Sequence, residues 1–105
     1  MANSRYVSGR RAEWKLRSQL EAEGFVCFRT AGSRSAFDLI AIDVKDSWNP
    51  VRLIQVKSTR DKGAAPRIIR KFFSNLPLPN PMSENYTQEI WVWIHGKGWV
   101  CECAN

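Results

Sequence analysis

Five consecutive apolar residues, Ile-Trp-Val-Trp-Ile at positions 90–94, constrain the fold of this chain more than any other feature. Side chains alternate between the two faces of a β-strand, so a strand that is apolar throughout needs cover on both faces. We therefore place this strand inside a sheet or at an interface. The chain has 105 residues, enough for one modest core but not for two, and we expect a single domain over residues 1–105.

Apolar periodicity and turn residues predict the remaining elements. Ala12, Leu16 and Leu20 recur at intervals of four and form one apolar stripe, which indicates a helix over residues 6–23. Ser8 is the expected N-cap of this helix and Gly24 its expected stop. A shorter helix is expected over residues 67–76, and strands over residues 25–29, 36–43, 51–57, 88–95 and 99–102. This order predicts an α/β domain with a mixed central sheet flanked by helices.

The charge of the chain is high and unevenly distributed. Sixteen Lys and Arg stand against ten Asp and Glu, which gives a net charge of +6 at pH 7. Residues 1–34 carry a net +4 and residues 57–71 a net +5, and these two basic blocks flank a segment that contains its own carboxylates. Such blocks commonly contact nucleic-acid phosphates, because each neutralised phosphate releases counterions. A solvated basic surface is the alternative. Binding to an anionic membrane is not favoured, because the sequence has no evident basic helix with a bulky apolar face.

The cysteines bear on the compartment. Cys27, Cys101 and Cys103 make an odd count, and no apolar run follows the charged N-terminal residues as it would in a secretory signal. No apolar stretch approaches the roughly 20 residues that span a bilayer. We therefore expect reduced cysteines and a cytoplasmic location.

The strongest chemical pattern consists of Asp38, Gln55 and Lys57. Gln55 and Lys57 are two residues apart on one predicted strand, so their side chains point to the same face. If the strand that holds Asp38 is a neighbour, these side chains can meet at one end of the sheet, and Glu13 on the first helix can complete the cluster. Carboxylate and amide oxygens suit Mg²⁺, which polarises a phosphate and helps to deprotonate water. Lys57 would add positive charge beside the reacting phosphorus, so the cluster suits phosphodiester hydrolysis.

Several short motifs, taken together and in order, resemble one known family. They are Gly9-Arg-Arg-Ala-Glu13, Gly24-Phe25, Arg29-Thr-Ala-Gly-Ser33, Asp38-Leu-Ile-Ala41 and Leu53-Ile-Gln-Val-Lys-Ser58. This series resembles the archaeal-type Holliday junction resolvases, which belong to the PD-(D/E)XK nuclease superfamily, over about the first 60 residues. The resemblance implies a restriction-endonuclease-like fold, Mg²⁺ or Mn²⁺ as cofactor, branched DNA as substrate, and a symmetric homodimer that makes paired nicks.

The resemblance also implies residue roles. The metal ligands would be Glu13, Asp38 and Gln55 with the adjoining Val56, and the catalytic set would add Lys57, Arg29 and Ser33. Gln55 departs from the family, which normally has glutamate there, and a neutral amide binds a hard cation more weakly. The expected phosphate contacts are Arg10, Arg11, Arg34, Arg60 and Lys62. A related nuclease of the superfamily and a DNA-binding protein without activity are the alternatives.

Other residues allow structural interpretations. Glu13 could simply pair with Arg17 at i+4 on the helix surface, and Asp43 is expected at the surface rather than in the cluster. His95 with Cys101 and Cys103 could bind zinc, but three ligands lack the second Cys/His pair of usual zinc modules, so we favour buried cysteines and a turn histidine. The side chains of Trp91 and Trp93 lie on the same face of the predicted strand. They could pack in the core, form a subunit interface or stack against a base.

Overall fold

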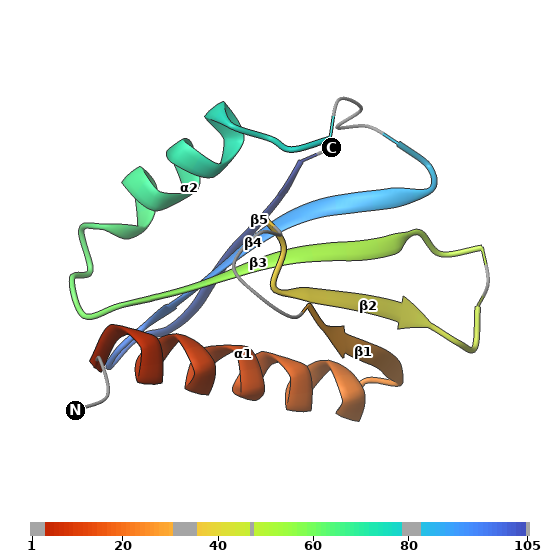
Figure 1. Cartoon of the computed structure of the whole chain (residues 1–105), viewed down its shortest axis with the longest axis horizontal. Helices are drawn as coiled ribbons and strands as arrows, with labels where there is room; N and C mark the ends of the chain where they lie inside the picture. Colours follow the sequence, from red (N-terminus) through yellow and green to blue (C-terminus); the bar gives the residue numbers. More distant parts are fainter. Residues whose placement is uncertain (1–3, 31–35, 47, 79–82, 105) are drawn as a thin grey trace.

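The computed structural model describes residues 4–30, 36–46, 48–78 and 83–104, and it contains one five-stranded sheet between two helices (Figure 1). The strands follow the order β1-β2-β3-β4-β5. Only β3 and β4 pair in parallel, and the other three pairs are antiparallel. The elements in chain order are α1 (Ser4–Ala22), β1 (Phe25–Arg29), β2 (Leu39–Asp43), β3 (Val51–Thr59), α2 (Ala65–Ser74), β4 (Tyr86–Ile94) and β5 (Gly98–Ala104).

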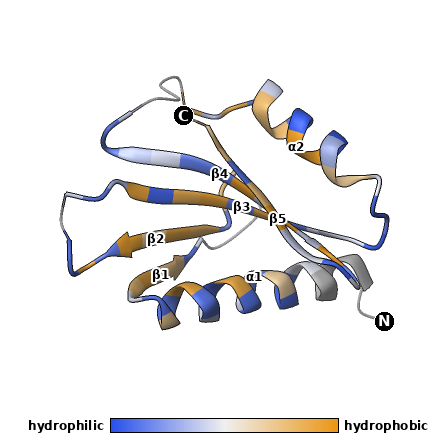
Figure 2. Cartoon of the chain, turned by 180° about the vertical axis from the view of Figure 1, so that it is seen from behind, coloured by the Kyte–Doolittle hydropathy of each residue, from blue (hydrophilic) through white to orange (hydrophobic). Residues whose placement is uncertain are grey.

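Each helix covers its own face of the sheet and closes its own core. The stripe of α1 packs on Ile54 and Val56 of β3, whereas α2 packs on the alternate residues of β4, which are Ile90, Val92 and Ile94. Trp91 and Trp93 point to the other face and pack against the α1 core. Figure 2 shows β1 and β2 as mostly hydrophobic, the first part of β4 as more polar, and both helices as banded by polar residues. Strand β4 therefore lies inside the sheet with both faces covered, as its sequence predicts.

The first helix departs from its prediction at one end. It begins at Ser4, so Ser8 lies inside the helix and the prediction that it caps the N-terminus is wrong. The other end agrees with the sequence: the helix stops at Ala22, and Gly24 follows with φ +101°, a backbone conformation that favours glycine.

Other boundaries also shift: α2 ends at Ser74 rather than at residue 76, and β4 and β5 begin at Tyr86 and Gly98 rather than at residues 88 and 99. Strand β2 begins at Leu39 rather than at residue 36. Strand β3 extends two residues past Lys57, because its parallel pairing with β4 continues to the pair Thr59–Ile94. The second helix begins at Ala65 instead of residue 67, because Pro66 fits in its first turn, where the N–H that proline lacks has no helical partner.

An ion pair joins β3 and β4 at the end of the sheet where β3 begins. The Arg52 guanidinium donates two hydrogen bonds of 2.8 Å to the two carboxylate oxygens of Glu89. Thr87 and Trp91 also donate to this buried carboxylate, at 2.6 and 3.1 Å. Burial raises the pKa of Glu89, but the hydrogen bonds from Arg52 and Thr87 outweigh it and hold the pKa below its usual value. This network joins the two parallel strands near the start of β3.

Neither described helix is long and apolar enough to cross a membrane.

Candidate functional site

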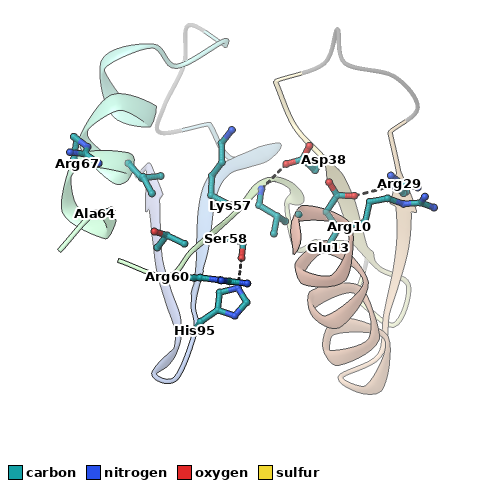
Figure 3. A pocket seen from close by; sticks show the side chains of 14 residues that line it. Arg10, Glu13, Arg29, Asp38, Lys57, Ser58, Arg60, Ala64, Arg67 and His95 are labelled. Atoms are coloured by element: carbon teal, nitrogen blue, oxygen red, sulfur yellow. Dashed lines mark hydrogen bonds and ion pairs between the residues drawn. The ribbon is translucent and has the colours of Figure 1, made fainter. Parts of the chain in front are cut away.

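A cavity of about 800 Å³ opens at one edge of the sheet, between the N-terminal halves of the two helices (Figure 3). At this edge β1 ends, β2 begins, and β3 and β4 both end. The described residues that line the cavity include two carboxylates, Glu13 and Asp38. Its basic side chains are Arg10, Arg29, Lys57, Arg60, Arg67 and His95. We call this space the edge cavity.

Glu13 joins α1 to β1. Its carboxylate accepts a hydrogen bond of 3.0 Å from Nε of Arg29, and only 17% of the Glu13 side chain is exposed. The alternative pairing of Glu13 with Arg17 is wrong, because Arg17 pairs with Glu21 at 2.8 Å on the outer surface of the helix. Glu13 is thus an inward-facing carboxylate held by a cation from the first strand.

Asp38 joins β2 to β3. Its Oδ2 accepts a hydrogen bond of 2.7 Å from the backbone N–H of Val56. The adjoining register pairs Leu39 with Ile54, so the strand that follows Asp38 and the strand that holds Gln55 are neighbours, which meets the condition for the cluster. The side chain of Asp38 therefore lies beside the end of β3, within the edge cavity.

Both carboxylates of the site have a pKa above the usual value. The pKa of Glu13 is raised by burial and by the negative charge of Asp38, against the opposing effects of Arg29 and Arg10. Burial also raises the pKa of Asp38, although the Val56 N–H, Lys57 and Arg29 act in the other direction. Two partly desolvated carboxylates that repel each other favour a cation between or beside them.

Lys57 and Gln55 differ in their relation to the cavity. Lys57 is exposed near the end of β3 and lines the edge cavity. Gln55 is half-buried one pleat earlier, on the face opposite Ile54 and Val56, and it is absent from the described lining. Glu13 and Asp38 are therefore the carboxylates of the described lining, to which Val56 also belongs.

The expected DNA-contact residues are only partly gathered here. Arg10 and Arg60 line the edge cavity, whereas Arg11 and Lys62 are exposed outside its described lining. Ser33 and Arg34 lie outside the residues that the structure describes. Asp43 sits at the opposite end of β2, where its carboxylate accepts a hydrogen bond of 2.7 Å from the Asn49 amide, as expected of a surface residue.

Ser58, Arg67 and His95 also line the cavity, although the sequence assigns none of them to the nuclease cluster. Ser58 Oγ lies 3.1 Å from Nε2 of His95, within hydrogen-bond distance. The signal that could have found this pair is the parallel pairing of β3 with β4, which brings their C-terminal ends together. Nothing local in the sequence specifies that pairing.

The residues of the zinc alternative are distributed differently from the expectation. Cys101 is exposed and Cys103 half-buried on β5, so the expectation that these two cysteines are buried is wrong. Within the described residues, no group of three or more His, Cys, Asp or Glu side chains is placed to hold a metal ion. The oxygens of Glu13, Asp38 and Val56 are nevertheless hard donors of the kind that Mg²⁺ prefers, since this ion keeps several waters and needs few protein ligands.

The tryptophans of β4 have partners within the chain. Trp91 and Trp93 each make an edge-to-face contact with Trp99, at centroid distances of 5.7 and 5.1 Å. The Lys15 ammonium lies 3.8 Å from the centroid of the Trp93 ring. Of the three expected settings, packing against the core is the one that these contacts show.

Comparison with solved structures shows a likeness of fold, whereas comparison of sequences shows none. No family model and no curated protein matches the sequence. The structure is similar to that of Hjc, a Holliday junction resolvase from the archaeal hyperthermophile Archaeoglobus fulgidus, with a TM-score of 0.50 and 14% sequence identity. The likeness covers 85% of this chain and 73% of that chain. At this identity it concerns the fold, and it confirms the predicted α/β class with a mixed sheet flanked by helices.

Proposed function

We propose that this protein is a metal-dependent DNA endonuclease that resolves four-way junctions, with residues 1–105 forming a single nuclease domain. The observation that carries the proposal is the convergence of Glu13, Asp38 and Lys57 on one cavity at a sheet edge. The resolvase-like fold supports it. Two carboxylates and a lysine beside a basic cavity are suited to hydrolysing a phosphodiester, whose anionic oxygens need both a cation and fixed positive charge.

Mg²⁺ or Mn²⁺ would be held by Glu13, Asp38 and the Val56 carbonyl, with Gln55 as a further ligand. The donor set fits such an ion: the carboxylates are partly desolvated, and Asp38 raises the pKa of Glu13. A bound ion supplies Lewis-acid polarisation of the phosphate and lowers the pKa of water.

The protein residues position and neutralise the substrate. The Val56 N–H orients the Asp38 carboxylate, and Glu13 orients the Arg29 guanidinium at the cavity. Arg29, together with Ser33, would then bind oxygens of the scissile phosphate. The ammonium of Lys57 would stabilise the negative charge that develops on them. The backbone phosphates further along the DNA would be bound by Arg10, Arg11, Arg34, Arg60 and Lys62.

The junction preference and the dimer rest on the resemblance rather than on the cavity. Resolution requires two nicks in opposed strands, and a two-fold homodimer provides two identical sites for them. Trp91 and Trp93 already pack within the chain, so we do not assign the dimer interface to them.

The test is a cleavage panel in Mg²⁺ and in Mn²⁺ with four-way junction, flap, linear duplex and single-stranded DNA at equal ionic strength. Paired nicks in the junction at a rate well above the other substrates support the proposal. Cleavage of flap or duplex in preference to the junction would instead identify a related nuclease of the superfamily. Tight binding without cleavage would identify a non-catalytic DNA-binding protein, the second candidate, which the neutral Gln55 favours.

A further inference from the structure

Two of the five tryptophans, all of which lie in the described part of the chain, have exposed side chains. The three in β4 and β5 pack against one another, whereas Trp14 is 72% exposed and Trp48 is 92% exposed. Trp48 lies in the turn between β2 and β3, at the end of the sheet away from the edge cavity. Trp14 lies on α1 directly after Glu13, which lines that cavity. Single exposed apolar residues are common on protein surfaces, so the position of Trp14 is the feature that needs an explanation.

Trp14 lines a shallow groove that continues the edge cavity. The described lining of the groove consists of Arg10, Glu13, Trp14, Arg17, Arg29 and Leu39. Arg10, Glu13 and Arg29 line the edge cavity as well, so the two spaces share one wall (Figure 3). The groove has a volume of about 60 Å³, far below the roughly 300–1,000 Å³ of pockets that enclose a ligand. A ligand at Trp14 would therefore lie on the exposed ring rather than inside a pocket.

Helical spacing places Trp14 between two arginines. Arg10 precedes it by four residues and Arg17 follows it by three, and side chains at these spacings are neighbours on the surface of a helix. On the side of the groove that faces β1, the Arg29 guanidinium donates a hydrogen bond of 3.0 Å to Glu13. The ring thus stands among cations and directly beside one carboxylate of the proposed site.

The charge around Trp14 favours a nucleic acid over a second copy of this chain as the partner. Three arginines and one glutamate belong to the lining of the groove, and the cations remain in excess when Glu21, the partner of Arg17, is included. The chain carries a net charge of +6, so two copies meeting here would bring like charges together, which is costly at an interface. A DNA strand is instead attracted. Proteins bind the bases of unpaired strands with aromatic rings set among cations in this way.

Only a base with an uncovered face can stack on such a ring. In a continuous duplex each base is covered on both faces by its neighbours, whereas a branch point interrupts the stack. We propose that the ring of Trp14 stacks on a nucleobase that the branch point leaves uncovered, next to the phosphate that is cleaved at the edge cavity. This inference rests on the proposed function and assigns to it a residue that selects branched over linear DNA. Trp14 would bind and position the substrate, while the chemistry stays with the carboxylates and Lys57.

The experiment compares the affinity of each protein for a four-way junction and for a linear duplex. Binding is measured in EDTA, where no metal-dependent cleavage occurs, for the wild type, Trp14→Ala, Trp14→Phe and Trp48→Ala. Trp14→Phe keeps an aromatic ring at the groove. Trp48→Ala is the matched control, because it removes an exposed tryptophan from the other end of the sheet. Equal unfolding temperatures of the variants would exclude loss of structure as the cause of any difference.

Trp14→Ala is expected to weaken junction binding about five- to a hundredfold, the range for loss of one base–aromatic stack, and to leave duplex binding within about twofold. Trp14→Phe should recover most of the loss, and Trp48→Ala should leave both affinities within about twofold of the wild type. The stacked base is then located by placing one abasic nucleotide at each branch-point position in turn. At one position the abasic nucleotide should weaken wild-type binding by a similar factor and leave Trp14→Ala binding nearly unchanged, because the stack is already lost.

The inference is overturned if Trp14→Ala weakens junction and duplex binding by the same factor, or weakens neither. It is also overturned if the abasic nucleotide affects the wild type and Trp14→Ala equally at every position. A change in oligomeric state on sedimentation of Trp14→Ala would identify a subunit contact instead. Each of these results can occur while the wild type still cleaves the junction, and the proposed function then stands without the stacking role. Absence of wild-type cleavage in both metals would remove the proposed function, whereas the binding measurements would still decide the role of Trp14.

Discussion

The carboxylate of Asp38 accepts a hydrogen bond of 2.7 Å from the backbone N–H of Val56, and this contact joins the residue before β2 to the last part of β3. It leaves the second carboxylate oxygen of Asp38 for the edge cavity, which is also lined by Glu13, held by Arg29. A site that brings two carboxylates together in a partly desolvated place should cost the fold some stability.

Asp38→Asn is expected to raise the unfolding temperature of the metal-free protein by a few degrees at pH 7. Burial raises the folded-state pKa of Asp38 above its usual 3.8, so the folded state binds the proton more tightly than the unfolded state. Stability from this group is thus present below about pH 3.8 and is lost as pH rises through the raised pKa. The asparagine oxygen can still accept the Val56 N–H. Thermal unfolding of both proteins in EDTA measures the difference, and a lower temperature for the variant would contradict it.

Mg²⁺ should stabilise the wild type and not the variant. An ion that binds only the folded protein raises its unfolding temperature with concentration, and removal of one of two carboxylates weakens that binding. Thermal unfolding with increasing Mg²⁺ tests this for the wild type, Asp38→Asn and Asp43→Asn. The Asp43 variant is the control, because that carboxylate is at the far end of β2 and should leave the response unchanged. Equal responses of all three would place the ion elsewhere.

Lys57→Ala is expected to lower the cleavage rate at least 100-fold while junction binding stays within a few fold. The ammonium would act on the charge that develops in the transition state, whereas most of the backbone affinity comes from the other basic residues. Lys62→Ala is the matched control, since it removes a lysine of the same basic block outside the cavity lining. It should lower affinity and leave the rate of the bound complex unchanged. Single-turnover kinetics separate the two effects, and comparable rate losses in both variants would speak against a specific role for Lys57.

Gln55→Glu should keep activity and lower the Mg²⁺ concentration that gives half the maximal rate. A carboxylate would replace a neutral amide as a ligand of a hard cation. The side chain of Gln55 is absent from the described cavity lining, so the variant also tests whether it turns toward the ion. An unchanged metal requirement, titrated at constant ionic strength, would remove Gln55 from the ligand set and leave Glu13 and Asp38.

Glu89→Gln is expected to destabilise the fold by about 3–5 kcal/mol, because it leaves the Arg52 guanidinium without its buried counter-charge. Arg17→Ala, which breaks the exposed pair with Glu21, should cost less than about 1 kcal/mol. Urea unfolding of both variants gives the two values. Similar small losses would show that the network around Glu89 does not hold the parallel strands in register.

The sequence predicts much of this architecture because its elements are specified locally. The stripe of α1 and the apolar residues on both faces of β4 are visible in short windows, and both helices and all five strands form close to their predicted positions. The order of the motifs and the alternation of side chains along a strand predict that Glu13, Asp38 and Lys57 lie close together. The Ser58–His95 contact could not be foreseen, since it depends on two strands that are far apart in the chain and pair in parallel. Alternation likewise puts Gln55 on the face of Lys57, but it does not say how far along that face the cavity extends.

Single-turnover cleavage of a four-way junction in Mg²⁺ by the wild type, Asp38→Asn and Asp43→Asn tests the proposed nuclease site. The wild type and Asp43→Asn are expected to nick two opposed strands at similar rates. Asp38→Asn is expected to be slower by at least 100-fold while it binds the junction within a few fold of the wild type. Wild-type rates from Asp38→Asn, or no cleavage by the wild type in either Mg²⁺ or Mn²⁺, would contradict the proposed site.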